Sequence, residues 1–151
     1  MSIFIGIDPG EHTGVAVWDG QRGAFEQVAS MPLHRALRLV RHIYKKELEN
    51  SGTYPARVVV VVEDARQRRW FPKEKNMSEY RGRLMGAGAA KRDARIWEEF
   101  LEDERIPFEM HKPEAGRTKW AADYFARVTG WTARTNEHSR DAALLVFNRK
   151  H

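Results

Sequence analysis

IFIGIDPGEHTGVAV, residues 3–17, is the stretch from which the rest of the chain can be ordered. Its isoleucines alternate from Ile3 to Ile7, and the Pro9-Gly10 pair that follows is typical of a turn. We therefore expect a buried strand, a tight turn and a returning strand. Asp8 then stands at the carboxyl end of the first strand, where its charge costs free energy unless a metal, a cation or hydrogen bonds compensate it. The alternative is an ordinary Asx-turn.

The composition favours one globular domain that covers residues 1–151. Of the 151 residues, 42% are hydrophobic, which is enough for one buried core but not for two. The chain has no cysteine, so disulfides and thiolate zinc sites are excluded and a reducing, cytoplasmic location is expected. We expect no signal peptide, because the N-terminus lacks a basic region and Asp8 breaks its apolar run, and no membrane span, because no segment reaches about 20 apolar residues. The formal net charge of +5 favours a polyanionic partner.

Turn residues and hydrophobic periodicity predict the remaining elements. A GQRG turn at 20–23 joins the returning strand to a third strand at 24–29. Apolar residues three and four apart then predict an amphipathic helix that ends near Gly52. The five valines of Val58–Val62 predict a central strand covered on both faces. After a loop, we expect a helix from Ser78 to about Asp103, a strand at 107–110, a helix at 117–128 and a last helix from about 136 to the C-terminus.

This order predicts an α/β fold with helices on both faces of a mixed five-stranded sheet. A three-strand meander would be followed by two strands that are reached through helical crossovers. The long helix contains a run of small residues, Gly86 to Ala90, which cost helix stability. We expect this run to pack closely against a neighbouring element and to form a dimer contact.

Carboxylates would meet at one rim of this sheet. Asp8 and Glu63 follow two strands that should be neighbours and parallel, and such strand ends are where α/β sheets place their sites. The last helix adds Glu137, His138 and Asp141, whose spacings of three and four residues allow each of the first two to share a face with Asp141. Oxygen and imidazole ligands without cysteine favour Mg²⁺, with Mn²⁺ as the alternative.

Two such ions about 3.5–4 Å apart would support phosphodiester hydrolysis. The alternative for each residue is structural. Glu63 and the following Asp64 would then simply end a strand, Glu137 would complement the helix dipole, and His138 would be a surface or capping residue.

The chain resembles the RuvC-type Holliday junction resolvases of the RNase H-like superfamily. The resemblance rests on GIDPGEHTGVA at Gly6–Ala16, the apolar run that ends in Glu63, and the closing H-x-x-D-A at His138–Ala142, and it covers the whole chain in element order. It implies metal ligands at Asp8, Glu63, His138 and Asp141, with Glu137 as the alternative fourth ligand. It also implies a homodimer that uses Mg²⁺ to nick opposed strands of a four-way junction. Of the family's lysines near the scissile phosphate, we place one first at Lys119 and second at Lys112.

The loop after Glu63 is a candidate DNA-binding surface. Basic side chains alternate there with aromatic ones, a pattern that suits phosphate contacts combined with stacking on an unpaired base. The alternative is a charged loop whose tryptophan packs into the core. The residues of this candidate surface are Arg66, Arg68, Arg69, Trp70, Phe71, Lys73 and Lys75.

Three other functions compete with a junction endonuclease. RNA-processing nucleases of the same superfamily share the first motif, but they generally lack the H-x-x-D-A ending. Sugar-kinase and actin-like ATPases have a related phosphate loop, but they need two such domains. The third alternative is a non-catalytic protein that binds junctions or duplexes through its basic faces, with structural carboxylates. Dependence of strand cleavage on a divalent metal would separate the enzymes from the binder.

Overall fold

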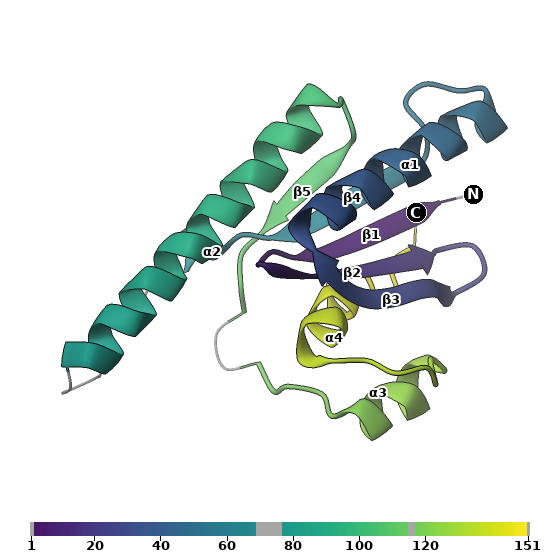
Figure 1. Ribbon diagram of the computed structural model, residues 1–151. Helices are drawn as coiled ribbons and strands as arrows, with labels where there is room; N and C mark the ends of the chain where they lie inside the picture. Colours follow the sequence, from purple (N-terminus) through teal and green to yellow (C-terminus); the bar gives the residue numbers. More distant parts are fainter. Residues whose placement is uncertain (1, 69–76, 115–116, 151) are drawn as a thin grey trace.

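The computed structural model describes residues 2–68, 77–114 and 117–150, which form one α/β unit around a five-stranded sheet (Figure 1). The strands are β1 (Ile3–Asp8), β2 (His12–Asp19), β3 (Ala24–Pro32), β4 (Val58–Glu63) and β5 (Phe108–His111). The helices are α1 (Leu33–Ser51), the short 3₁₀ helix η1 (Ala65–Gln67), α2 (Met77–Asp103), α3 (Ala122–Thr129) and α4 (Glu137–Leu144).

The predicted sheet is confirmed. The strand order is β3-β2-β1-β4-β5, with antiparallel pairing from β1 to β3 and parallel pairing of β4 with both β1 and β5. β1 is the central strand and β4 lies beside it, and all the valines of β4 except the partly buried Val59 are fully buried, as expected for a strand covered on both faces.

Helices cover both faces of the sheet (Figure 1). On one face, Val40 of α1 and Trp97 and Leu101 of α2 pack on the isoleucines of β1 and the valines of β4. On the other face, Phe125 of α3 and the alanines of α4 pack with Phe4 and Trp18. None of the helices in the described residues has the length and apolar content needed to span a membrane.

Three sequence-based boundaries or contacts are wrong. The helix expected from residue 117 begins only at Ala122, after Ala121 in an extended conformation, and residues 117–120 belong to no helix or strand. The last helix ends at Leu144, and the turns that follow bring Phe147 against Trp18 at 5.4 Å between ring centroids. The glycines of the small-residue run of α2 are not closely packed against the described part of the chain, since a Cβ added at Gly86 or Gly88 would meet nothing within 4 Å.

Candidate functional site

Asp8 and Glu63 are the last residues of the two central parallel strands, β1 and β4. The strands are in register up to the preceding pair, Ile7 and Val62, so both carboxylates leave the sheet at the same rim. The first turn of α4 lies over this rim and brings His138 within reach, with Nδ1 3.2 Å from Oδ2 of Asp8. Residues 130 positions apart therefore meet at one point.

Two glycines allow α4 to lie this close to the sheet. A Cβ added at Gly14 would stand 2.0 Å from the carbonyl oxygen of His138, and one added at Gly6 would stand 2.0 Å from that of Ala142. Gly14 is also the strand partner of Asp8, so any side chain at this position would push α4 away from the carboxylate. The glycines of the GIDPGEHTGVA motif thus set the distance between the strand and helix parts of the site.

Asp8 lies in surroundings that oppose its negative charge. Its side chain is only 17% exposed. Burial raises the pKa of Asp8 to about 6, and the nearby Glu63 and Asp141 carboxylates add to this effect, while the hydrogen bond to His138 opposes it. A carboxylate at a strand end whose pKa is raised by burial and by neighbouring carboxylates is typical of a functional site, because a bound cation would relieve the repulsion.

Cationic side chains pair with the other carboxylates of the rim. The Lys119 ammonium contacts Asp141 and lies 3.3 Å from a Glu137 oxygen, and Arg68 lies 3.7 Å from Glu63. Burial alone would lower the pKa of Lys119, but the two acidic partners outweigh it and raise that pKa. Glu137 therefore faces Lys119, whereas His138 faces Asp8.

These charges line a cleft of about 210 Å³ beside the rim. The cleft combines carboxylates with cations, which suits a ligand that is both anionic and metal-bound, such as a phosphodiester. Sequence reasoning assigned no functional role to two of its residues, because Glu114 directly follows Pro113 outside any predicted element and Arg117 was expected only to begin a helix. The described lining residues are Glu63, Arg68, Glu114, Arg117, Lys119 and Asp141.

The residues expected to bind DNA are placed differently from one another. Arg66 is engaged within the protein: its guanidinium donates to both carboxylate oxygens of Asp64 at 2.7 and 2.9 Å, and to Glu98 of α2 at 3.0 Å. Arg68 is 60% exposed and lines the cleft, and Lys112 is exposed directly after β5. The remaining candidates, Arg69, Trp70, Phe71, Lys73 and Lys75, lie outside the described residues.

The donor types at the rim fit a hard divalent cation. Asp8, Glu63 and Asp141 offer carboxylate oxygens, and the His138 ring offers one nitrogen besides the one that faces Asp8. Within residues 2–68, 77–114 and 117–150, no three acidic or imidazole groups are already arranged as a metal site. In this conformation protein cations, Lys119 and Arg68, neutralise two of the carboxylates.

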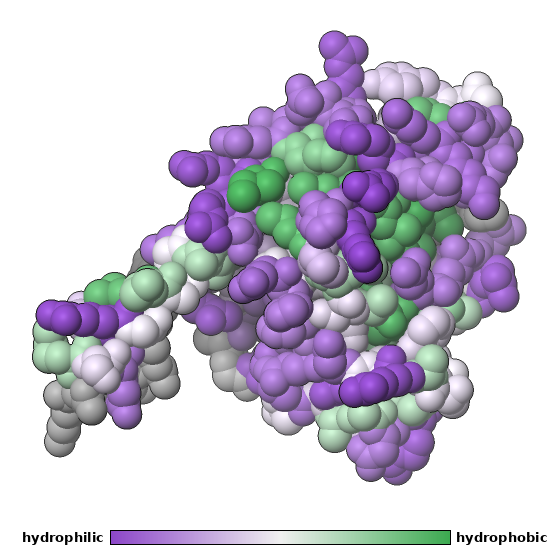
Figure 2. Space-filling view, viewed as in Figure 1, coloured by the Kyte–Doolittle hydropathy of each residue, from purple (hydrophilic) through white to green (hydrophobic). Residues whose placement is uncertain are grey.

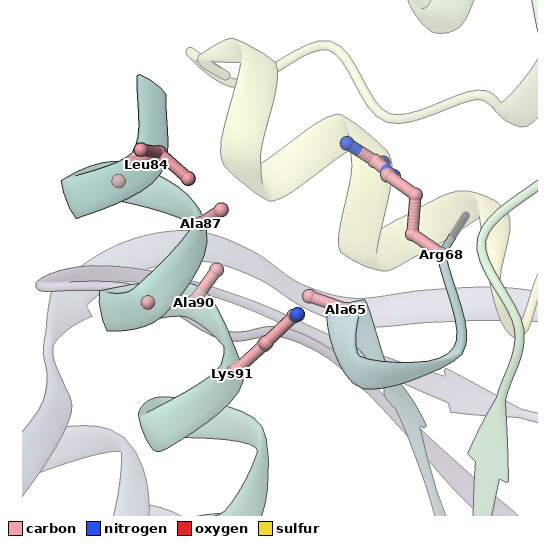
Figure 3. A pocket seen from close by; sticks show the side chains of 8 residues that line it. Ala65, Arg68, Leu84, Ala87, Ala90 and Lys91 are labelled. Carbon is pink, nitrogen blue, oxygen red and sulfur yellow. The ribbon is translucent and has the colours of Figure 1, made fainter. Parts of the chain in front are cut away.

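A second, more apolar groove of about 500 Å³ lies on the other side of Arg68, between η1 and α2. Figure 3 shows Ala87, Ala90 and Lys91 of α2 directed across it toward Ala65. Beyond the groove, the first half of α2 projects from the body and carries hydrophobic side chains among hydrophilic ones (Figure 2). Met85 there is 77% exposed.

A scan of the chain against protein-family models finds no match, and a search of curated proteins finds none either.

Proposed function

We propose that the protein is a Mg²⁺-dependent endonuclease that nicks opposed strands of four-way junctions or other branched DNA. The observation that carries the proposal is the convergence of Asp8, Glu63 and Asp141, from two central strands and one helix, beside a cleft that also contains cations. Carboxylates alone would repel a phosphodiester. Arg68, Arg117 and Lys119 lie in the same cleft as the carboxylates. The cleft therefore contains both carboxylates that can bind a metal ion and cations that can bind a phosphate.

Each group has a role in this proposal. Asp8, Glu63 and Asp141 hold the cations, with His138 completing the set, and Lys119 approaches the phosphate whose bond is cut. Two bound Mg²⁺ ions, or Mn²⁺ in their place, would activate the attacking water and stabilise the leaving oxygen. Lys119 contacts Asp141, which would also bind a metal ion. Its ammonium is therefore held next to the metal site, where the developing negative charge of the phosphate needs a donor.

The substrate and the assembly are parts of the same proposal. A two-fold homodimer would match the symmetry of a four-way junction, and the exposed Leu84 and Met85 on the projecting half of α2 offer an apolar surface for it. The open glycines at 86 and 88 would let a second helix approach closely. A cytoplasmic location belongs to the proposal as well, since the chain contains no cysteine.

The function is tested by incubating the protein with a labelled four-way junction, a matched duplex and a structured RNA, each with Mg²⁺ and with EDTA. We expect paired nicks in opposed junction strands with Mg²⁺ only, and little cutting of the duplex. Preferential RNA cleavage would favour an RNA-processing nuclease. Junction binding without cleavage under any metal condition would instead identify a non-catalytic binder and refute the enzyme.

The neighbouring residues Glu137 and His138 should respond differently to alanine substitution. Because His138 contacts Asp8 and Glu137 contacts Lys119, His138→Ala should weaken Mg²⁺ binding by about 10-fold or more, the loss typical of a metal site's close partners. Glu137→Ala should leave Mg²⁺ affinity within about 2-fold, since a charge this exposed is screened by solvent. Isothermal titration with Mg²⁺ measures both. Stronger loss in Glu137→Ala would make Glu137 the fourth ligand.

A further inference from the structure

Lys119 lies in residues 117–121, which belong to no helix or strand and lead into α3 at Ala122. Lys119 is a long side chain that is 61% exposed, so its ion pairs with Asp141 and Glu137 alone would hold it weakly. Something else in the fold has to fix the backbone from which it extends.

Arg140 contacts that backbone directly. Its Nε donates to the carbonyl oxygen of Trp120 at 2.8 Å, one residue after Lys119. Its Nη1 donates to the hydroxyl oxygen of Thr135 at 2.9 Å, just before the Asn136 cap of α4. A planar guanidinium held at two atoms has a fixed orientation, so the Trp120 carbonyl is fixed relative to α4.

The Trp120 ring provides a second anchor for the same segment. It packs edge-on against Tyr124 at 4.8 Å and against Phe147 at 6.2 Å, at the margin of the core beneath α4. The side chain and the carbonyl of Trp120 are thus both held. Because Asp141 follows Arg140 in α4, one helical turn presents the acidic partner of Lys119 and the anchor for its backbone together.

We propose that Arg140 is a positioning residue that places Lys119 at the candidate active site by holding the Trp120 carbonyl. Lys119 is the group that acts on the phosphate, so this role rests on the function proposed above. Among the described residues, the Arg140 side chain bonds to Trp120 and Thr135, and neither of these carries a carboxylate or lines the charged cleft. Its effect on cleavage should therefore pass entirely through Lys119.

The rate at which an amine-reactive acetylating reagent modifies Lys119 in EDTA, followed by mass spectrometry, tests the positioning without any cleavage assay. Lys45 and Lys46, which are exposed on α1, serve as internal references. In Arg140→Gln, Lys119 should be modified about 5-fold faster relative to the references, because its partners hold it less of the time. Arg140→Lys, which retains a donor, should restore most of the protection.

Arg149→Gln is the matched control. Arg149 also donates to a main-chain carbonyl, that of Leu145 at 3.1 Å, and to a carboxylate, Glu109 at 2.9 Å, but it lies beyond the far end of α4. Its loss should leave Lys119 modification unchanged. If Arg140→Gln does not fold, Thr135→Ala removes only one of the guanidinium contacts and should accelerate modification about 2-fold. An unchanged Lys119 rate, or an equal acceleration of Lys45 and Lys46, would overturn the proposal.

Cleavage kinetics provide the second readout. Arg140→Gln should lower kcat about 10-fold with KM unchanged, as expected when a catalytic group is misplaced and binding is not. In a Lys119→Ala background the same change should cost less than about 2-fold, because the residue through which it acts is gone. Fully additive losses would refute the positioning role. Absence of cleavage in the wild-type protein would refute the proposed function alone and would leave the modification result standing.

Discussion

Replacing Asp8 with asparagine should abolish junction cleavage and, in the absence of metal, make the folded protein more stable. The first effect follows from the loss of a ligand charge, which costs several kcal/mol of transition-state stabilisation, or about 10³-fold in rate or more. The second follows because burial and the Glu63 carboxylate raise the pKa of Asp8 to about 6, so its ionised form destabilises the fold at neutral pH. We expect a gain of about 1–2 kcal/mol, or a Tm higher by about 2–8 °C, in EDTA at pH 7.5.

The size of this stabilisation depends on pH. A carboxyl whose pKa is higher in the folded state than in the unfolded chain destabilises the fold fully above the folded pKa, and this cost disappears as pH falls toward the unfolded pKa. The advantage of Asp8→Asn should therefore be complete above pH 6 and vanish near about pH 4. Mg²⁺ should raise the Tm of the wild type more than that of the variant. A variant less stable than the wild type in EDTA at pH 7.5 would show that Asp8 is a structural residue.

Asp64, one residue after β4, provides the matched control with the opposite sign. Burial would raise its pKa, but hydrogen bonds from Arg66 and Gln67 outweigh this and hold the pKa below its usual value. The ionised Asp64 thus stabilises the fold above the unfolded pKa, and this stabilisation is lost as pH falls through the folded pKa. Asp64→Asn should lower the Tm at pH 7.5. Asp8 would then be a carboxylate that destabilises the fold and is retained for its function, whereas Asp64 would be a carboxylate that stabilises the fold.

The sheet could be predicted from sequence because its signals are local. Alternating isoleucines, a five-valine run, the Pro9-Gly10 turn and the GQRG turn each specify a strand or its end within a few residues. The end of α4 could not be predicted in this way. Residues 142–147 are all apolar, so their sequence contains no periodicity that marks where the helix stops. The stop at Leu144 depends on a tertiary contact, the packing of Phe147 on Trp18 and Phe25.

Some features of the candidate site could likewise be predicted from sequence, and others could not. Asp8 and Glu63 could be paired from sequence because parallel neighbours share a rim, and the spacing of His138 and Asp141 placed both on one helical face. The separate partners of Glu137 and His138 could not be predicted, since they depend on how far α4 is rotated over the sheet. The cleft residues Glu114 and Arg117 were missed because Glu114 falls in no predicted element and Arg117 was placed at the start of a predicted helix that in fact begins at Ala122.

Gly6 and Gly14 set the orientation of α4 and its distance from the sheet. Replacing Gly14 with alanine should therefore disrupt both the fold and the site. The new Cβ would stand 2.0 Å from the His138 carbonyl oxygen and 3.2 Å from the Asp8 Cβ. The first atom belongs to the backbone, so α4 must move by about 1 Å, a form of overpacking that costs about 1–3 kcal/mol or more. Misplacement of that size lowers catalytic rates by about 10²-fold. Thermal unfolding and junction cleavage measure the two losses.

Gly82→Ala in α2 is the control, because a Cβ at that position meets nothing within 4 Å and alanine favours a helix by about 1 kcal/mol. It should raise the Tm slightly and leave cleavage unchanged. Gly6→Ala separates the two effects of Gly14→Ala, since its Cβ would collide with the Ala142 carbonyl, one turn further from His138. We expect Gly6→Ala to lose comparable stability but less Mg²⁺ affinity than Gly14→Ala. Wild-type Tm and Mg²⁺ affinity in Gly14→Ala would mean that α4 does not rest on this glycine.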